Sequence, residues 1–194
     1  MNSKLKKIID DYLLTDEYNE FKKFCDKHYT EICGVEEITD YAENNLAIPY
    51  CGILDSGCNR LVFKYVDSNF DDWIVKFEYM DMGGNFDERE LIRYLKDNGL
   101  DYLLENLNLP VYSKGPFQVY PVLSPLDPGE YDKQILVELK MDFDAEGICI
   151  DDLDNRPDNF GVTKDGKIVI SDYEQWEILK CEVDKGKLNN FAKR

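Results

Sequence analysis

Hydrophobic residues in the first 45 positions recur at the three- and four-residue spacing of amphipathic helices. Two such sets are separated by Thr15, a residue type that often caps a helix. Their members are Leu5, Ile8, Ile9, Tyr12 and Leu13 in the first set, and Tyr18, Phe21, Phe24, Cys25 and Tyr29 in the second. A third short helix is expected over Val35–Asn44. We expect these helices to contribute packing and no chemistry.

After Pro49 the pattern changes to short runs that are rich in β-branched and aromatic residues. Three such runs cover residues 50–54, 60–66 and 72–79, and polar turn residues separate them. Runs of this length and composition predict strands. We therefore expect a three-stranded antiparallel meander.

A helix and two further strands are expected next. The segment "FDERELIRYLKDNG" from Phe86 has a helical apolar face, and Gly99 stands where a C-cap is expected. Residues 109–115 and 117–124 are predicted to be two strands with a Lys-Gly turn between them. The Pro-rich segment 124–130 then marks a boundary or hinge.

The last third of the chain is predicted to hold one helix and one hairpin. The helix is expected over Tyr131–Phe143, and "FGVTKDGKIVIS" from Phe160 has the pattern of a hairpin with its turn at "KDG". The residues after Glu174 are too few to form another lobe. The element order predicts an α+β fold, in which a helix is inserted after the third of five antiparallel strands.

The net charge of −17, from 40 acidic and 23 basic residues, limits the expected partners. Binding to nucleic acid or to an anionic membrane requires clustered positive charge, so neither partner is expected. The acidity has two explanations, solubility and mimicry of nucleic acid, and solubility is the simpler one.

The cysteines and the apolar runs indicate the compartment. The six cysteines are scattered without a C-x-x-C pair, and His28 is the one histidine, so a structural zinc site is not expected. No run approaches the roughly 18 apolar residues of a membrane span, and the N-terminus lacks the apolar core of a signal peptide. These features predict a cytoplasmic protein with free thiols.

The acidic stretch from Asp152 to Glu174 suggests metal chemistry of two kinds. For calcium, "DFDAEGICIDDL" from Asp142 has acidic side chains at positions 1, 3 and 5 of an EF-hand loop and Gly at position 6. Position 12, where the loop needs Glu, is Leu153, which argues against calcium. Phosphoryl transfer instead needs a carboxylate facing the attacking hydroxyl, oxygen ligands for Mg²⁺ and a Lys on the phosphates.

Three residues of this stretch have the right types and order for phosphoryl transfer. Asn159 and Asp172 stand at the two ends of the predicted hairpin, so they can lie side by side and share a metal. Asp154 lies in the loop before the hairpin and is free to face a hydroxyl.

At these residues the sequence resembles the protein-kinase-like family. "DNRPDN" from Asp154 resembles the catalytic loop D-x-K-P-x-N, with Arg156 in place of Lys, and "DYE" from Asp172 resembles D-F-G. Upstream, "WIVKF" resembles the V-A-I-K strand with its Lys at Lys76. Glu88 has apolar residues three, four and seven positions later, as the helix glutamate of the family does.

The resemblance implies a role for each of these residues. ATP and Mg²⁺ would be the cofactors, with Lys76 on the phosphates and Glu88 as its partner. Asp154 would be the catalytic base on a loop that also carries Arg156, while Asn159 and Asp172 would hold the metal. The implied nucleotide-binding residues are Gly57, Val62, Lys76 and Leu123, with the segment Ser124–Asp127 as the hinge that holds the adenine.

The implied fold has two lobes and an extension. Residues 1–48 would be a helical extension, 49–123 the N-lobe with its five-stranded sheet and one helix, and 124–194 a strongly reduced C-lobe. In the small size of its C-lobe the chain is similar to some secreted bacterial effector kinases and to small kinase-like proteins of phages. We expect the N-terminal helices to replace the packing of the missing C-lobe.

The chain departs from the family pattern at several positions. Asp55 and Arg60 stand at two of the three glycine places of the Gly-rich loop, and only Gly57 remains. Asp152 and Leu153 replace the His and Arg before the catalytic Asp, and Glu174 replaces the Gly of D-F-G.

Two functions remain open at this point. The first is an ATP- and Mg²⁺-dependent kinase that phosphorylates a Ser or Thr hydroxyl of a protein. The second is a pseudokinase or acidic inhibitor that binds a host protein, in the host cytoplasm if the chain comes from a phage or an effector. A small-molecule kinase is a third possibility, weakened by the reduced C-lobe. The partner is in either leading case a protein.

Overall fold

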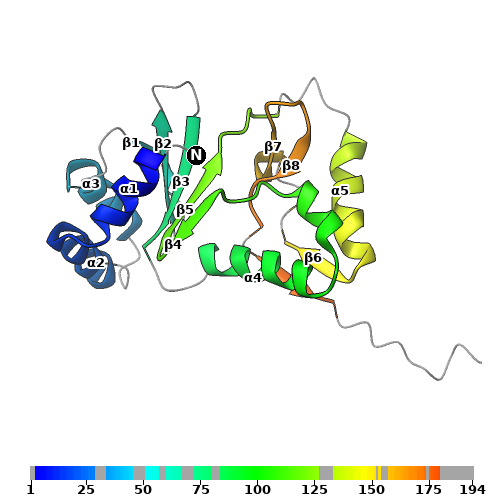
Figure 1. The fold of residues 1–194 in the computed structure, drawn as a ribbon, viewed down its shortest axis with the longest axis horizontal. Helices are drawn as coiled ribbons and strands as arrows, with labels where there is room; N and C mark the ends of the chain where they lie inside the picture. The colour runs from blue at the N-terminus through cyan, green and yellow to red at the C-terminus, as the bar shows by residue number, and fades with distance from the viewer. Residues whose placement is uncertain are drawn as a thin grey trace, which may run out of the picture.

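The computed structural model of the 194-residue chain describes most of its sequence. The described residues are 3–28, 34–45, 51–56, 60–66, 72–79, 84–126, 133–151, 153, 157–173 and 175–179. Figure 1 shows them as a central sheet with helices on either side of it.

Three helices open the chain, as the hydrophobic spacing predicts. They are α1 (Ser3–Tyr12), α2 (Asp16–His28) and α3 (Gly34–Asn45). Thr15 separates the first two, where its Oγ1 accepts a hydrogen bond of 3.2 Å from the backbone N–H of Tyr18. This bond satisfies one of the N–H groups that have no partner inside the helix, so Thr15 is the N-cap of α2.

The sheet is antiparallel and has five strands in the order β1-β2-β3-β5-β4. The strands are β1 (Cys51–Ser56), β2 (Arg60–Val66), β3 (Asp72–Glu78), β4 (Tyr112–Lys114) and β5 (Phe117–Pro121). The helix α4 (Gly84–Asp97) and the 3₁₀ helix η1 (Asp101–Asn106) lie between β3 and β4 in the chain. The predicted meander, the inserted helix and the α+β class are therefore confirmed.

The two faces of this sheet have different side chains, because successive residues of a strand point to opposite sides. Odd-numbered residues such as Phe63, Val75 and Val119 are buried in an apolar cluster with the N-terminal helices. Even-numbered residues such as Val62 and Lys76, which are paired across β2 and β3, line a cleft on the other face.

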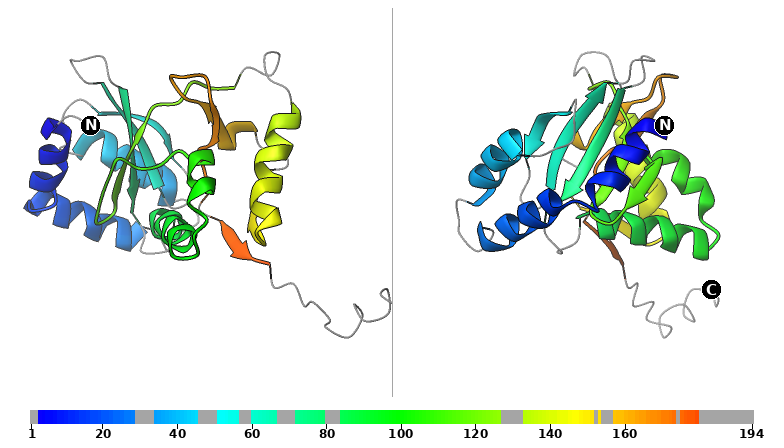
Figure 2. Two further views of the ribbon diagram at one scale, coloured as in Figure 1. Left: turned by 45° about the vertical axis from the view of Figure 1, so that its right-hand side comes forward. Right: turned by 60° about the vertical axis from the view of Figure 1, so that its left-hand side comes forward.

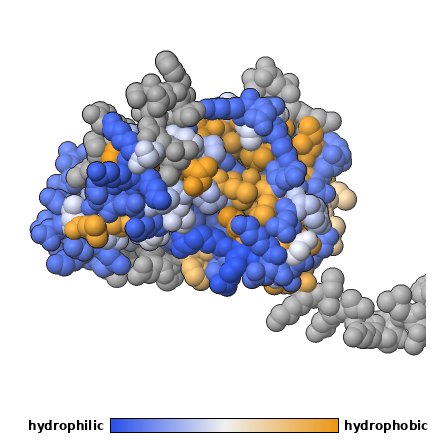
Figure 3. Space-filling model, viewed as in Figure 1, coloured by the Kyte–Doolittle hydropathy of each residue, from blue (hydrophilic) through white to orange (hydrophobic). Residues whose placement is uncertain are grey.

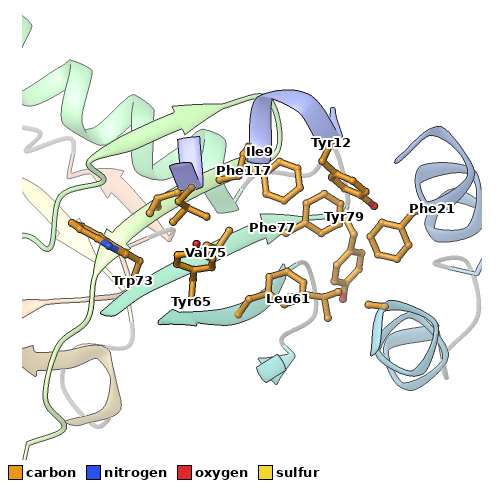
Figure 4. Packing of buried hydrophobic residues seen from close by; sticks show 14 of the residues in the cluster. Ile9, Tyr12, Phe21, Leu61, Tyr65, Trp73, Val75, Phe77, Tyr79 and Phe117 are labelled. Carbon is orange, nitrogen blue, oxygen red and sulfur yellow. The ribbon is translucent and has the colours of Figure 1, made fainter. Parts of the chain in front are cut away.

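The N-terminal helices pack on the odd-numbered face. Phe21 of α2 lies 5.3 Å from the ring of Phe77 in β3, and Tyr12 of α1 lies 6.2 Å from the ring of Phe117 in β5. Figure 4 shows these rings directed toward one another between the helices and the sheet. The expectation that these helices replace C-lobe packing is therefore wrong. The helices cover the apolar, odd-numbered face of the sheet, which would otherwise be exposed to solvent.

The C-terminal half forms a second apolar cluster beside α4. Its elements are α5 (Lys133–Ala145), β6 (Ile148–Ile150), the 3₁₀ helix η2 (Pro157–Asn159), β7 (Phe160–Val162), β8 (Ile168–Ile170) and β9 (Trp176–Ile178). Leu91, Phe143 and Tyr173 are among its buried members. Figure 2 shows this half and the N-terminal helices on opposite sides of the sheet.

The short strands of this half pair in two ribbons. β7 and β8 form the predicted hairpin, and Gly166 in its turn has a φ of 84°, which favours glycine. β6 pairs with β9, which the sequence pattern missed. Within the described ranges, no helix combines the length and apolar character that a membrane span requires.

Candidate functional site

A cleft of about 470 Å³ lies between the even-numbered face of the sheet and the β7–β8 hairpin. Its apolar lining comes from both sides of the cleft and from the segment after β5. These residues are Val62, Ile74, Leu123, Leu126 and Phe160. Charged side chains lie at one part of the same lining, and they are Arg60, Lys76, Asp158 and Asp172. On the face shown in Figure 3 most of the surface is hydrophilic, and apolar residues gather between the sheet and α5.

Lys76 and Glu88 are in direct contact beside this cleft. Nζ of Lys76, from β3, lies 2.8 Å from Oε1 of Glu88, from α4, and Nζ also donates a hydrogen bond of 3.0 Å to the backbone oxygen of Ser171. Glu88 is fully buried and only 11% of the Lys76 side chain is exposed. The structure thus brings together the two residues that the sequence pattern pairs.

Tyr120 of β5 fixes the other oxygen of Glu88. Its hydroxyl contacts both Oε2 of Glu88 and Oε1 of Gln118, and its single proton can be donated to either. Burial, with the nearby Glu88 carboxylate, raises the pKa of Tyr120 well above its usual value, so the hydroxyl stays protonated. The ring also lies below Lys76, whose Nζ is 4.8 Å from its centroid.

Asn85 and Gln118 anchor the start of α4 to the sheet. Nδ2 of Asn85 donates to the backbone oxygen of Pro116 at 2.6 Å, and Nε2 of Gln118 donates to the backbone oxygen of Asn85 at 3.0 Å. Both side chains are fully buried. Buried polar groups of this kind set one orientation of an element, and here they hold the turn of α4 that carries Glu88.

Arg60 is a site residue that the sequence pattern missed. Its Nη1 lies 2.9 Å from Oε1 of Glu88, and its Nη2 lies 2.8 Å from Oδ1 of Asp172. The predicted run 60–66 and β2 both begin at Arg60, but the sequence pattern gave this residue only a glycine place of the Gly-rich loop and no ion-pair partner. Strand alternation was the available signal, because Arg60 is two residues before Val62 and therefore lies on the same face of the sheet as Val62 and Lys76.

Asn159 and Asp172 lie side by side at one end of the β7–β8 hairpin. The backbone oxygen of Asn159 accepts hydrogen bonds from the backbone N–H of Ser171 at 2.7 Å and of Asp172 at 3.4 Å. Oδ1 of Asp172 also lies 4.0 Å from Nζ of Lys76. Asp172 is thereby placed next to the Lys76–Glu88 pair.

The residue types at this end of the hairpin are those expected for a magnesium site, and the contacts that join Asn159 to Asp172 are backbone hydrogen bonds. One carboxylate and one amide are oxygen donors of the type that Mg²⁺ takes when substrate phosphates complete its coordination. Within the described residues, no group of three or more His, Cys, Asp and Glu side chains is placed to hold a metal by itself. A Mg²⁺ ion held by Asn159 and Asp172 would need further oxygen ligands, such as those of a phosphate.

The remaining predicted site residues fall into two groups. Val62 and Leu123 line the cleft, and Leu123 lies against Gly161 of β7, where an added Cβ would be 2.6 Å from Cβ of Leu123. Gly57, Asp154 and Arg156 lie outside the described residues, so their roles stay predictions.

Comparison with known proteins does not assign the chain to a family. No protein-family model matches the chain, and no curated protein matches its sequence. One similar solved structure is that of the Rv3197–erythromycin complex from Mycobacterium tuberculosis, with a TM-score of 0.41 and 14% identity. The match covers 91% of this chain and 60% of that one, so the chain spans less than two thirds of its length. We therefore base the functional proposal on the residues of the cleft.

Proposed function

We propose that the cleft binds ATP and that the protein transfers a phosphoryl group to a Ser or Thr hydroxyl of a protein. The observation that carries this proposal is the buried Lys76–Glu88 ion pair of 2.8 Å beside an apolar cleft, with Asp172 at 4.0 Å from the same Lys. Phosphoryl transfer by kinases needs such a Lys–Glu pair and an Asp near the phosphates.

The two parts of the cleft suit the two parts of a nucleotide. Val62, Leu123 and Phe160 offer apolar walls for a planar base, since burial of a ring between such side chains is favourable. Lys76 and Arg60 offer positive charge for phosphates at the other part. The segment after β5, which includes Leu123, supplies backbone groups that would hold the edge of the adenine.

The architecture supports a kinase-like arrangement in two lobes. In this arrangement the five-stranded sheet and α4 form the N-lobe within residues 49–123, and residues 124–194 form a reduced C-lobe. The cleft then lies between the lobes. Residues 1–48 are the extension of this proposal, and its helices α1, α2 and α3 pack on the sheet.

Each polar residue has a defined task in this proposal. Lys76 binds the phosphates, Glu88 orients Lys76, and Asp154 accepts the proton of the attacking hydroxyl on the loop that carries Arg156. Asn159 and Asp172 are the residues that would hold Mg²⁺, which supplies charge neutralisation at the phosphates when bound.

A second candidate is a pseudokinase that inhibits a host protein in the cytoplasm. Two observations favour it, namely the pairing of Asp172 with Arg60 and the net charge of −17. An acidic surface can occupy a basic protein partner, and a site whose Asp is already neutralised is a weaker metal site.

An assay with labelled ATP and Mg²⁺ tests both candidates. Wild type is compared with Asp154→Ala and Asp172→Ala, and Asp165→Ala in the exposed hairpin turn is the matched control. The kinase proposal predicts label on the protein itself or on a host lysate with wild type and Asp165→Ala only. An ATP-induced thermal shift without transfer would favour the pseudokinase, and the absence of both would refute ATP binding.

A further inference from the structure

Arg60 joins the two carboxylates of the cleft. Its guanidinium donates to Glu88 at 2.9 Å and to Asp172 at 2.8 Å, although Asp172 is 112 residues away in the chain. Only 9% of the Arg60 side chain is exposed, whereas 40% of the Asp172 side chain is exposed at the cleft. The guanidinium therefore sits behind Asp172, on its buried side.

The four charges of this cluster balance one another. Lys76 and Arg60 carry two positive charges, and Glu88 and Asp172 carry two negative ones. Glu88 is fully buried and contacts Lys76, Arg60 and the hydroxyl of Tyr120. Asp172 is the exposed carboxylate of this cluster, so within the cluster its negative charge is the one that an incoming cation would meet.

A divalent metal and Arg60 both need this carboxylate. Mg²⁺ requires its oxygen ligands at about 2.0–2.1 Å in near-octahedral geometry. Nη2 of Arg60 already approaches Oδ1 of Asp172, and a second cation at the same carboxylate would be repelled by the guanidinium. This repulsion weakens metal binding for as long as Arg60 stays in place.

We propose that Arg60 competes with the divalent metal for Asp172, and that a nucleotide phosphate relieves this competition. The second half rests on the proposed nucleotide site. A guanidinium pairs with phosphate through two parallel hydrogen bonds, and Arg60 and Lys76 line the same cleft. A bound phosphate thus offers Arg60 an alternative anion. Metal and nucleotide then bind cooperatively, and metal alone binds weakly.

Direct titration with Mn²⁺, in the absence of nucleotide, tests the competition. Mn²⁺ prefers the same oxygen ligands as Mg²⁺, and the signal of the free ion in electron paramagnetic resonance reports its binding. The variant is Arg60→Gln, and Lys64→Gln is the matched control. Lys64 is on the same strand and forms an ion pair of 3.0 Å with Asp72, outside the cleft lining. Each protein is also measured with Asp172→Asn added. The Mn²⁺ binding that remains comes from other acidic groups and is subtracted.

Arg60→Gln is expected to bind Mn²⁺ about tenfold more tightly than wild type, within the range typical of coupling between sites. This gain should vanish with Asp172→Asn and be absent from Lys64→Gln. Equal or weaker binding by Arg60→Gln would overturn the competition, because a purely structural Arg60 predicts a loss.

Two further measurements keep the outcomes separate. Thermal unfolding establishes that Arg60→Gln is folded, and Arg60→Lys, which keeps the charge, should bind Mn²⁺ with intermediate affinity. The thermal shift of wild type with ATP, with and without Mn²⁺, then tests the nucleotide. If ATP shifts the melting temperature of wild type but Arg60→Gln shows no gain of Mn²⁺ affinity, the inference is refuted and the proposed function is not. Absence of any ATP shift refutes the proposed function and, with it, the role of phosphate in relieving the competition.

Discussion

Glu88 and Lys76 form an ion pair of 2.8 Å in which the carboxylate is fully buried. Replacing Glu88 with Gln removes the buried carboxylate that Lys76 and Arg60 share. Removal of one partner from a buried charge cluster costs about 3–5 kcal/mol of unfolding free energy, which chemical denaturation measures. Glu90→Gln, on the same helix, breaks only a surface pair with Arg93, and its expected cost is below about 0.5 kcal/mol. Equal costs for the two variants would contradict the burial argument.

The hydroxyl of Tyr120 is expected to stabilise the fold as well as orient Glu88. Tyr120→Phe leaves buried oxygens of Glu88 and Gln118 without this donor, at a cost of about 1–3 kcal/mol. Tyr102→Phe is the control, because its hydroxyl donates to Glu146 at an exposed position, where its loss should leave the unfolding midpoint nearly unchanged. If the proposed function holds, Tyr120→Phe should also weaken ATP binding, and an unchanged ATP-induced thermal shift would argue against its role in orienting Glu88.

Close packing at Gly161 is expected to determine the shape of the cleft wall. A Cβ at this position would lie 2.6 Å from Cβ and 2.7 Å from Cδ1 of Leu123. Gly161→Ala must therefore displace Leu123, with an expected cost of about 1–3 kcal/mol in thermal or chemical unfolding. Gly52→Ala, where an added Cβ would meet no atom within 4 Å, is the control. The double change Gly161→Ala with Leu123→Gly, which removes the clashing Cβ and Cδ1 together, should cost less than the sum of the two single changes; strict additivity would refute the clash.

Packing of the N-terminal helices on the sheet predicts a large effect of Phe21→Ala. Phe21 is buried between Tyr41 and Phe77, so its removal should cost about 3–5 kcal/mol in chemical denaturation. Leu14, of which 86% is exposed, is the control, and Leu14→Ala should change stability by less than about 0.5 kcal/mol. An unfolding midpoint of Phe21→Ala that matches wild type would mean that α2 is not part of the core.

The contact of α1 with β4 predicts a pH dependence in acid. A hydrogen bond from Tyr112, assisted by Lys114, lowers the pKa of Asp10 below its ordinary value of 3.8. A lowered pKa in the folded state means stabilisation that is present above 3.8 and is lost as the pH falls through the folded value. Asp10→Asn should therefore lower the melting temperature at pH 7 more than at pH 3. Tyr112→Phe removes the donor, so Asp10→Asn in the Tyr112→Phe background should show a smaller difference between the two pH values.

Local patterns were sufficient to predict the five-stranded sheet, the longer helices and the β7–β8 hairpin, with the residues that depend on them. Strand alternation around Lys76 and helix spacing around Glu88 each involve a few neighbouring residues, and the structure places both side chains where these patterns indicate. The hairpin that sets Asn159 next to Asp172 follows from its turn residues in the same way.

Contacts between distant segments could not be predicted from such patterns. Arg60, at the start of β2, contacts Asp172 across 112 residues of chain, and no local spacing encodes that contact. The pairing of β6 with β9 joins Ile150 to Trp176 through strands of three residues each, too short to give a clear alternation. The helices at the N-terminus have an apolar face, but their spacing does not say which surface covers it.

The division of the sheet into an odd-numbered and an even-numbered face has a practical consequence for engineering. Stability and ligand preference can be varied in separate libraries, although both draw on the same strands. Randomising buried positions such as Phe63 and Val75 changes the stability of the fold. Randomising Val62 and Ile74 changes the wall of the cleft. A new specificity selected at the second set of positions then starts from a core that has not been altered.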